Sequence, residues 1–172
     1  FRSAEELMVE QARRLTAVRR AAQGKGLELV TVKADGNCLL RLIARYLGHD
    51  SETTQFPELR EQLAARLRDG VSDKEAWTLG YSLEEAVDFQ TDGRFGELVH
   101  LQAAALQFGV RILVINAGDS GGSMFDPVER WLEPAGTDGS ASVWVFIHDG
   151  GNHWYGAQPL APTEGFKLQR AE

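Results

Sequence analysis

Apolar residues recur along this chain with two kinds of spacing. Steps of three and four residues predict helices over residues 3–24, 38–47, 57–70, 82–90 and 95–109. Alternating or continuous apolar runs predict strands over residues 27–32, 110–115, 128–132, 143–147 and 153–158. Because helices are interleaved with a few strands and then followed by them, we predict an α+β domain with a small central sheet.

The last two predicted strands should form a hairpin. Residues 148–152 between them read His-Asp-Gly-Gly-Asn, a composition typical of a tight turn. Residues 116–140 are rich in glycine, aspartate, serine and proline, so apart from the one short strand we predict irregular chain there.

Length and composition fit a single domain. A chain of 172 residues with 43% hydrophobic residues can bury one sizeable core. We therefore predict one domain over residues 1–172, with its core in residues 25–160 and an N-terminal helix over residues 3–23 that Gly24 ends. The chain begins at Phe1 rather than at methionine, so we expect it to be a fragment of a longer protein.

The net charge of −7 argues against two classes of partner. General affinity for nucleic acid or anionic membranes needs concentrated lysine and arginine. No run of about 18 uncharged apolar residues occurs, so no membrane-spanning segment is predicted. We expect a monomer that binds neither nucleic acid nor membrane, and we interpret the arginines of the first helix as a solvated surface (Arg13, Arg14, Arg19 and Arg20).

Cys38 is the only cysteine, which excludes an internal disulfide and a multi-cysteine zinc site. A lone cysteine is most often a small buried hydrophobic residue. Cys38, however, begins a predicted helix directly after a tight turn, where backbone N–H groups and the helix dipole should stabilise a thiolate. The N–H groups of Asp35, Gly36 and Cys38 are also candidates to bind a developing oxyanion.

A thiol nucleophile needs a general base, and four histidines compete for this role. His153 is the leading candidate, because it begins the second strand of the predicted hairpin, an element rigid enough to orient an imidazole. His148 lies near the turn of the same hairpin and is the main rival. His49 and His100 fall at the end of one helix and within another, and we interpret both as solvated or core residues.

Three segments together resemble the ovarian-tumour (OTU) family of cysteine proteases. The first is Asp35-Gly36-Asn37-Cys38-Leu39-Leu40, followed by a helix. The second is the helix from residue 96 to Gly109 that leads into an apolar strand, and the third is Asn152-His153-Trp154 after a glycine-containing turn. They occur in the family's order and cover residues 25–160.

The resemblance implies a papain-like fold, with a mostly antiparallel sheet packed between helices. It implies a deubiquitinase that cleaves isopeptide bonds at the C-terminus of ubiquitin or a ubiquitin-like protein, without metal or cofactor. Cys38 would attack the carbonyl and His153 would carry the proton. Asp35 would shape the oxyanion loop, and the substrate channel would involve the residues beside the nucleophile and the base (Asn37, Asn152 and Trp154).

The sequence departs from the family at one position. Many members carry Asp or Asn two residues after the histidine, where it orients the imidazole ring, but this chain has Tyr155. The candidates for that place are Asp35, Asp149, Asn152 or an acid elsewhere in the chain, and the alternative is an enzyme that uses only Cys38 and His153. Asn152 should point to the opposite face of the strand and Asp149 lies in the turn, so Asp35 is chosen by default.

Two other functions stay open on the sequence. One is a related thiol peptidase or glutamine deamidase within a larger toxin-like protein. The other is a catalytically weak OTU-like module that binds ubiquitin, which the missing acid favours and the intact Cys38 and His153 oppose. Frequent alanine, arginine, glycine and leucine suit a bacterial gene, in which case we expect an effector that acts in the cytoplasm of a host cell.

Overall fold

The computed structural model describes residues 3–49, 56–69, 96–117, 129–134, 137–151 and 153–159. The described helices are α1 (Ala4–Gly24), α2 (Cys38–Tyr46), α3 (Phe56–Asp69) and α6 (Leu98–Phe108). The strands are β1 (Leu27–Val30), β2 (Arg111–Asn116), β3 (Glu129–Leu132), β4 (Val143–His148) and β5 (Trp154–Pro159). The helix predicted over residues 82–90 lies outside the described residues.

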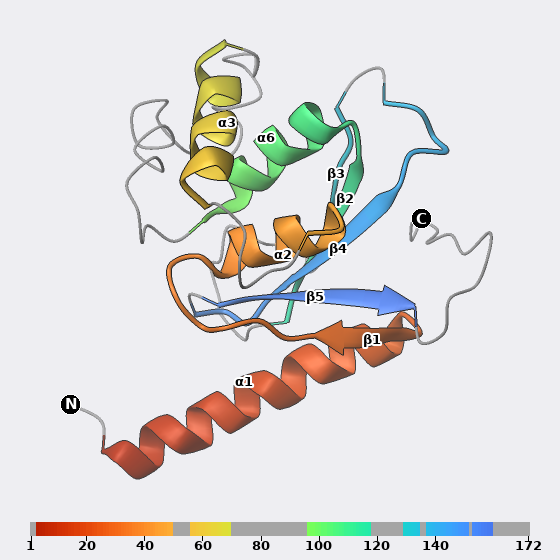
Figure 1. Cartoon of the computed structure of the whole chain (residues 1–172). Helices are drawn as coiled ribbons and strands as arrows, with labels where there is room; N and C mark the ends of the chain where they lie inside the picture. Colours follow the sequence, from red (N-terminus) through yellow and green to blue (C-terminus); the bar gives the residue numbers. More distant parts are fainter. Residues whose placement is uncertain are drawn as a thin grey trace.

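The five described strands form one sheet in the order β1-β5-β4-β2-β3. The pairs β1–β5, β5–β4 and β2–β3 are antiparallel, and only β2–β4 is parallel. Helix α1 lies along one face of this sheet, while α2, α3 and α6 lie on the other side (Figure 1). The predicted α+β architecture, with a mostly antiparallel sheet between helices, is confirmed.

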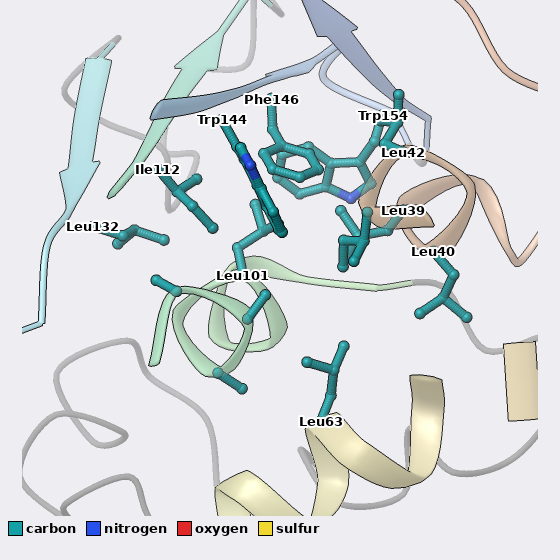
Figure 2. Packing of buried hydrophobic residues seen from close by; sticks show 14 of the residues in the cluster. Leu39, Leu40, Leu42, Leu63, Leu101, Ile112, Leu132, Trp144, Phe146 and Trp154 are labelled. Atoms are coloured by element: carbon teal, nitrogen blue, oxygen red, sulfur yellow. The ribbon is translucent and has the colours of Figure 1, made fainter. Parts of the chain in front are cut away.

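Successive side chains of the central strands enter two separate cores, as the pleat of a strand requires. Ile112 and Val114 of β2 face α2 and α6, whereas Leu113 and Ile115 face α1. The larger core also holds Trp144, Phe146 and Trp154, which meet leucines of α2 and α6 (Figure 2). Both faces are buried, which explains why the sequence of β2 is a continuous apolar run rather than an alternating one.

Most differences from the predicted boundaries are small and occur where caps decide the end of an element. Helix α6 begins at Leu98 because the Glu97 side chain and the His100 ring cap its first turn reciprocally, and it ends at Gly109, which has φ +63°. His100 is therefore a buried capping residue, as its interpretation as a structural histidine predicted. Strand β1 ends at Val30, two residues earlier than predicted.

Tyr46 fixes the end of α2 against the sheet. Its hydroxyl accepts a hydrogen bond from the N–H of Ala157 (3.1 Å) and donates to the carbonyl of Val145. Burial raises the pKa of Tyr46 to about 12, so the phenol keeps its proton and stays a donor. Since Val145 and Ala157 belong to β4 and β5, this contact holds the helix of Cys38 in a fixed position relative to the hairpin that carries His153.

Helix α1 contacts the same hairpin from the other face of the sheet. Val18 and Ala22 are fully buried beneath the strands. Nearer the start of α1, the guanidinium of Arg14 forms an ion pair with Glu10 (2.8 Å) and lies so close to Gly151 that a Cβ atom there would collide with it. Arg14 therefore packs on the turn between β4 and β5 and is not simply part of a solvated surface.

Candidate active site

The loop before Cys38 is a closed turn held by its own backbone. The N–H of Cys38 donates to the carbonyl of Asp35 (3.1 Å), and the N–H of Asn37 donates to Oδ1 of the Asp35 side chain (3.0 Å). This pattern is an Asx turn, which explains the aspartate at the first position. Helix α2 follows at once, because the N–H of Arg41 donates to the carbonyl of Asn37 (2.9 Å).

The carboxylate of Asp35 is bound by an arginine from α2. Nη2 of Arg41 lies 2.9 Å from Oδ2 of Asp35, and Nε lies 3.3 Å from Oδ1. These hydrogen bonds hold the pKa of Asp35 below its usual value, despite partial burial. Asp35 thus stays ionised and ties the turn to the first turn of α2.

A second arginine, from α3, supports the turn from beneath. Nη2 of Arg60 donates to the carbonyl of Gly36 and to Oδ1 of Asn37, both at 2.8 Å. The Arg60 side chain is fully buried. Neither arginine was predicted from the sequence, although each leaves a signal there. Arg41 interrupts an apolar helix, and Arg60 falls on the buried stripe of α3.

Cys38 is fully buried and lies against the start of β5. Its sulfur accepts from the backbone N–H groups of Trp154 and Leu39, which favours a thiolate. Burial acts in the opposite direction and is the larger effect, so the pKa of Cys38 is raised above its usual value. The predicted stabilisation of a thiolate by the helix N-terminus is therefore present but outweighed.

His153 directly precedes the residue whose N–H meets the Cys38 sulfur. Its carbonyl accepts from the N–H of Asp149 (3.3 Å), which closes the end of the hairpin. Burial lowers the pKa of His153, and the negative charges of Asp149 and Asp35 oppose this shift only in part. Nδ1 of His153 is buried and has no hydrogen-bond partner among the described residues.

These features place the Cys38 thiol against the backbone of Trp154, the residue that follows His153, although the two segments are distant in the chain. With the thiol pKa raised and the imidazole pKa lowered, the resting pair is neutral. A neutral imidazole that comes within reach of a neutral thiol can accept its proton as the sulfur attacks, which is general-base activation of a nucleophile.

A comparison with protein-family models matches residues 33–151 to the OTU-like cysteine proteases. This chain belongs to that family. The matched segment includes the Cys38 turn, and it ends just before His153. No curated protein matches the chain in a separate comparison.

Solved structures of other OTU domains share the fold. The OTUD1 OTU domain superposes with a TM-score of 0.64 at 18% identity, covering 88% of this chain and 98% of that one. The Hazara virus OTU bound to ubiquitin gives 0.54 at 18% identity, with 79% and 83% covered. An OTU deubiquitinase from Wolbachia pipientis wMel bound to ubiquitin gives 0.52 at 12% identity, with 78% and 96% covered.

Other residues that the OTU resemblance singled out occupy defined places. Trp154 is 1% exposed, and its indole Nε1 donates to the carbonyl of Gly96 (2.9 Å). Trp154 is therefore a core residue that packs behind the site. Its part in a substrate channel stays a prediction. Asn37 uses its side-chain oxygen to accept from Arg60, as described above. Asn152 lies outside the described residues.

Two of the three candidate oxyanion donors already have partners within the turn. The N–H of Asp35 donates to the carbonyl of Lys33 (3.0 Å), and the N–H of Cys38 donates to the carbonyl of Asp35. An oxyanion that forms beside Cys38 would have to compete with these carbonyls. The oxyanion role of Asp35, Gly36 and Cys38 stays a prediction.

His148, the other candidate for the base, is a buried residue at the end of β4, in the same hairpin as His153. Its Nδ1 accepts from the N–H of Gly150 (3.1 Å), and its ring packs on the indole of Trp154 with the centroids 4.7 Å apart. Burial lowers the pKa of His148 to about 4. A histidine so hard to protonate is suited to supporting Trp154 rather than to exchanging protons near neutral pH.

This burial predicts acid sensitivity of the folded state. As the pH falls below about 6.5, the unfolded chain binds a proton at His148 and the folded chain does not, which lowers the free energy of unfolding. The contribution of His148 to stability is therefore fully present above that pH and is lost progressively toward pH 4. Between pH 7 and pH 5 the loss from this group should be about 2 kcal/mol. Urea unfolding of the wild type and of His148→Gln at both pH values measures it. Equal losses in the two proteins would contradict the prediction.

Among the described residues, no group of histidine, cysteine and acidic side chains is placed to hold a metal ion. No helix in the described part of the chain is long and apolar enough to cross a membrane.

Proposed function

We propose that this chain is a deubiquitinase that hydrolyses isopeptide bonds at the C-terminus of ubiquitin or a ubiquitin-like protein. The observation that carries the proposal is the contact between the Cys38 sulfur and the N–H of Trp154, which brings the nucleophile to the residue beside His153. Membership of the OTU-like cysteine proteases supports the same chemistry. Two similar structures, from Hazara virus and Wolbachia, contain bound ubiquitin and support the choice of substrate.

In the first step, the Cys38 sulfur attacks the carbonyl carbon of the isopeptide bond while Nδ1 of His153 accepts the thiol proton. We assign the proton to Nδ1 because this nitrogen is buried and lacks a partner among the described residues. The tetrahedral intermediate collapses when the imidazolium gives its proton to the lysine amine, which leaves. A thioester on Cys38 remains.

In the second step, water attacks the thioester carbonyl and His153 accepts a proton from that water. As the second intermediate collapses, the imidazolium returns this proton to the departing Cys38 sulfur, and the C-terminal carboxylic acid of ubiquitin is released and ionises. Because Cys38 has no exposed surface in this structure, neighbouring atoms must move before either step. A ubiquitin tail that enters the site would supply the binding energy for that movement.

We propose that Asp35 acts through the turn and not through a hydrogen bond to His153. Asp35→Asn removes the charge that binds Arg41 and should lower kcat/KM about 10- to 100-fold, because the turn loosens. Arg41→Gln should cause a similar loss, and the double variant should lose little more than either single variant. A loss near 1,000-fold for Asp35→Asn, with Arg41→Gln close to wild type, would instead show that the carboxylate acts on His153.

The test of the proposed function is a ubiquitin probe with an electrophile in place of its C-terminal carboxylate. Reaction with Cys38 would add the mass of the probe to the intact protein. A mass increase with the ubiquitin probe, together with turnover of a fluorogenic ubiquitin substrate, supports the deubiquitinase. Binding of ubiquitin without reaction would support the weak binding module, and neither binding nor reaction would favour a peptidase or deamidase with another substrate.

We propose a cytoplasmic site of action, since ubiquitin conjugates are found there. The likeness to the Wolbachia deubiquitinase supports a bacterial effector that acts in a host cell. The net charge of −7 suits a monomer that binds neither nucleic acid nor anionic membrane, which we also propose.

A further inference from the structure

The residue after Trp154 touches the general base directly. Tyr155 and His153 are two residues apart on β5, so their side chains leave the strand on the same face. Their ring centroids lie 4.3 Å apart with an interplanar angle of 85°, so the edge of one ring meets the face of the other. This is the position at which the sequence lacks an acid.

Tyr155 is itself held in place. Its backbone is paired with Ile147 of β4, and its half-buried ring packs against the cluster between the sheet and α1. Arg19 of α1 is near enough for its charge to act on the phenol. A ring held by two strands and a helix has little freedom to move, so it can restrict the movement of the neighbouring His153 side chain.

No carboxylate takes this place in the described structure. The Asp35 carboxylate is bound to Arg41, and Oδ1 of Asp149 accepts from the N–H of Gly151 (2.7 Å). Both acids act on His153 through their charge, and neither forms a hydrogen bond to its ring in the described structure. The Tyr155 ring is therefore the side chain whose observed contact restricts the orientation of the imidazole.

We propose that Tyr155 is a positioning residue that orients His153 toward Cys38 through ring contact, in the place where an acid would otherwise do so. This inference rests on the proposed function of His153 as the base. Edge-to-face contact restricts rotation of the imidazole. The electron-rich face of a phenol ring also favours a nearby cation, so the contact helps the imidazolium that forms during catalysis. Both effects need the ring and neither needs the hydroxyl.

The test compares three changes at this position. Tyr155→Phe keeps the ring and should retain kcat within about threefold. Tyr155→Leu removes the ring and should lower kcat about 10- to 100-fold with KM changed less than about threefold. Tyr155→Asp replaces the ring by an acid on the same face and should recover part of the activity lost in Tyr155→Leu. Trp131→Leu is the matched control, because it removes an aromatic ring from the same cluster on β3, the strand at the far edge of the sheet from β1 and β5.

Alkylation of Cys38 by iodoacetamide, followed by intact mass across pH 5–9, gives a second readout that needs no ubiquitin. Cys38 is the only cysteine, so each added mass reports this site. The rate should fall for Tyr155→Leu and not for Tyr155→Phe or Trp131→Leu. If ubiquitin substrates fail but the alkylation order holds, the proposed function is wrong and the role of Tyr155 stands. Equal losses for Tyr155→Phe and Tyr155→Leu, or wild-type alkylation in Tyr155→Leu, would overturn the inference.

Discussion

Replacing Cys38 with alanine is expected to abolish hydrolysis of a fluorogenic ubiquitin substrate, because the chain contains no other thiol. The variant should still fold. The Cys38 side chain is fully buried, so losing the sulfur should cost about 1 kcal/mol. For a domain of this size that cost corresponds to a melting temperature lower by about 2–4 °C.

Activity and stability must be measured on the same preparation for this result to be decisive. Activity of the alanine variant within tenfold of the wild type would remove Cys38 from the mechanism. The matched control is Leu40→Ala on the same buried helix, which should lower the melting temperature more than Cys38→Ala does and leave most of the activity.

Loss of the general base is the second large effect that we expect. His153→Ala should lower kcat by about 1,000-fold or more, because a buried thiol with a raised pKa depends on a partner to remove its proton. The variant should stay folded, since His153 is only partly buried and lies at the end of the hairpin. Steady-state kinetics with the fluorogenic substrate at pH 7.5 would measure the loss.

The two histidines of the hairpin provide the comparison for this experiment. His148→Gln keeps a polar side chain next to the N–H of Gly150 and should reduce kcat less than tenfold. If His148→Gln stayed fully folded and lost more of its kcat than His153→Ala, His148 would be the base. The pH dependence of kcat/KM adds a check, since a lowered pKa of His153 places the acidic limb below pH 6.5.

The sequence alone determined the parts of this protein that depend on neighbours in the chain. Helical and strand periodicities predicted the described elements to within a few residues, because caps and apolar spacing are local properties. The turn from Asp35 to Cys38 was also readable, since an aspartate, a glycine and an asparagine before an apolar helix specify an Asx turn at a helix start. The two-sided burial of the sheet followed from the apolar run of β2.

The tertiary structure decided what depends on contacts between distant segments. It brought Cys38 to the start of β5, and it showed His148 to be a core residue packed on Trp154. It also reversed the expected effect on the thiol, because the desolvation of a buried sulfur exceeds the stabilisation by nearby N–H groups. Periodicity cannot report this balance, since the free energy of a charge depends on every atom that replaces water around it, and those atoms come from the whole fold.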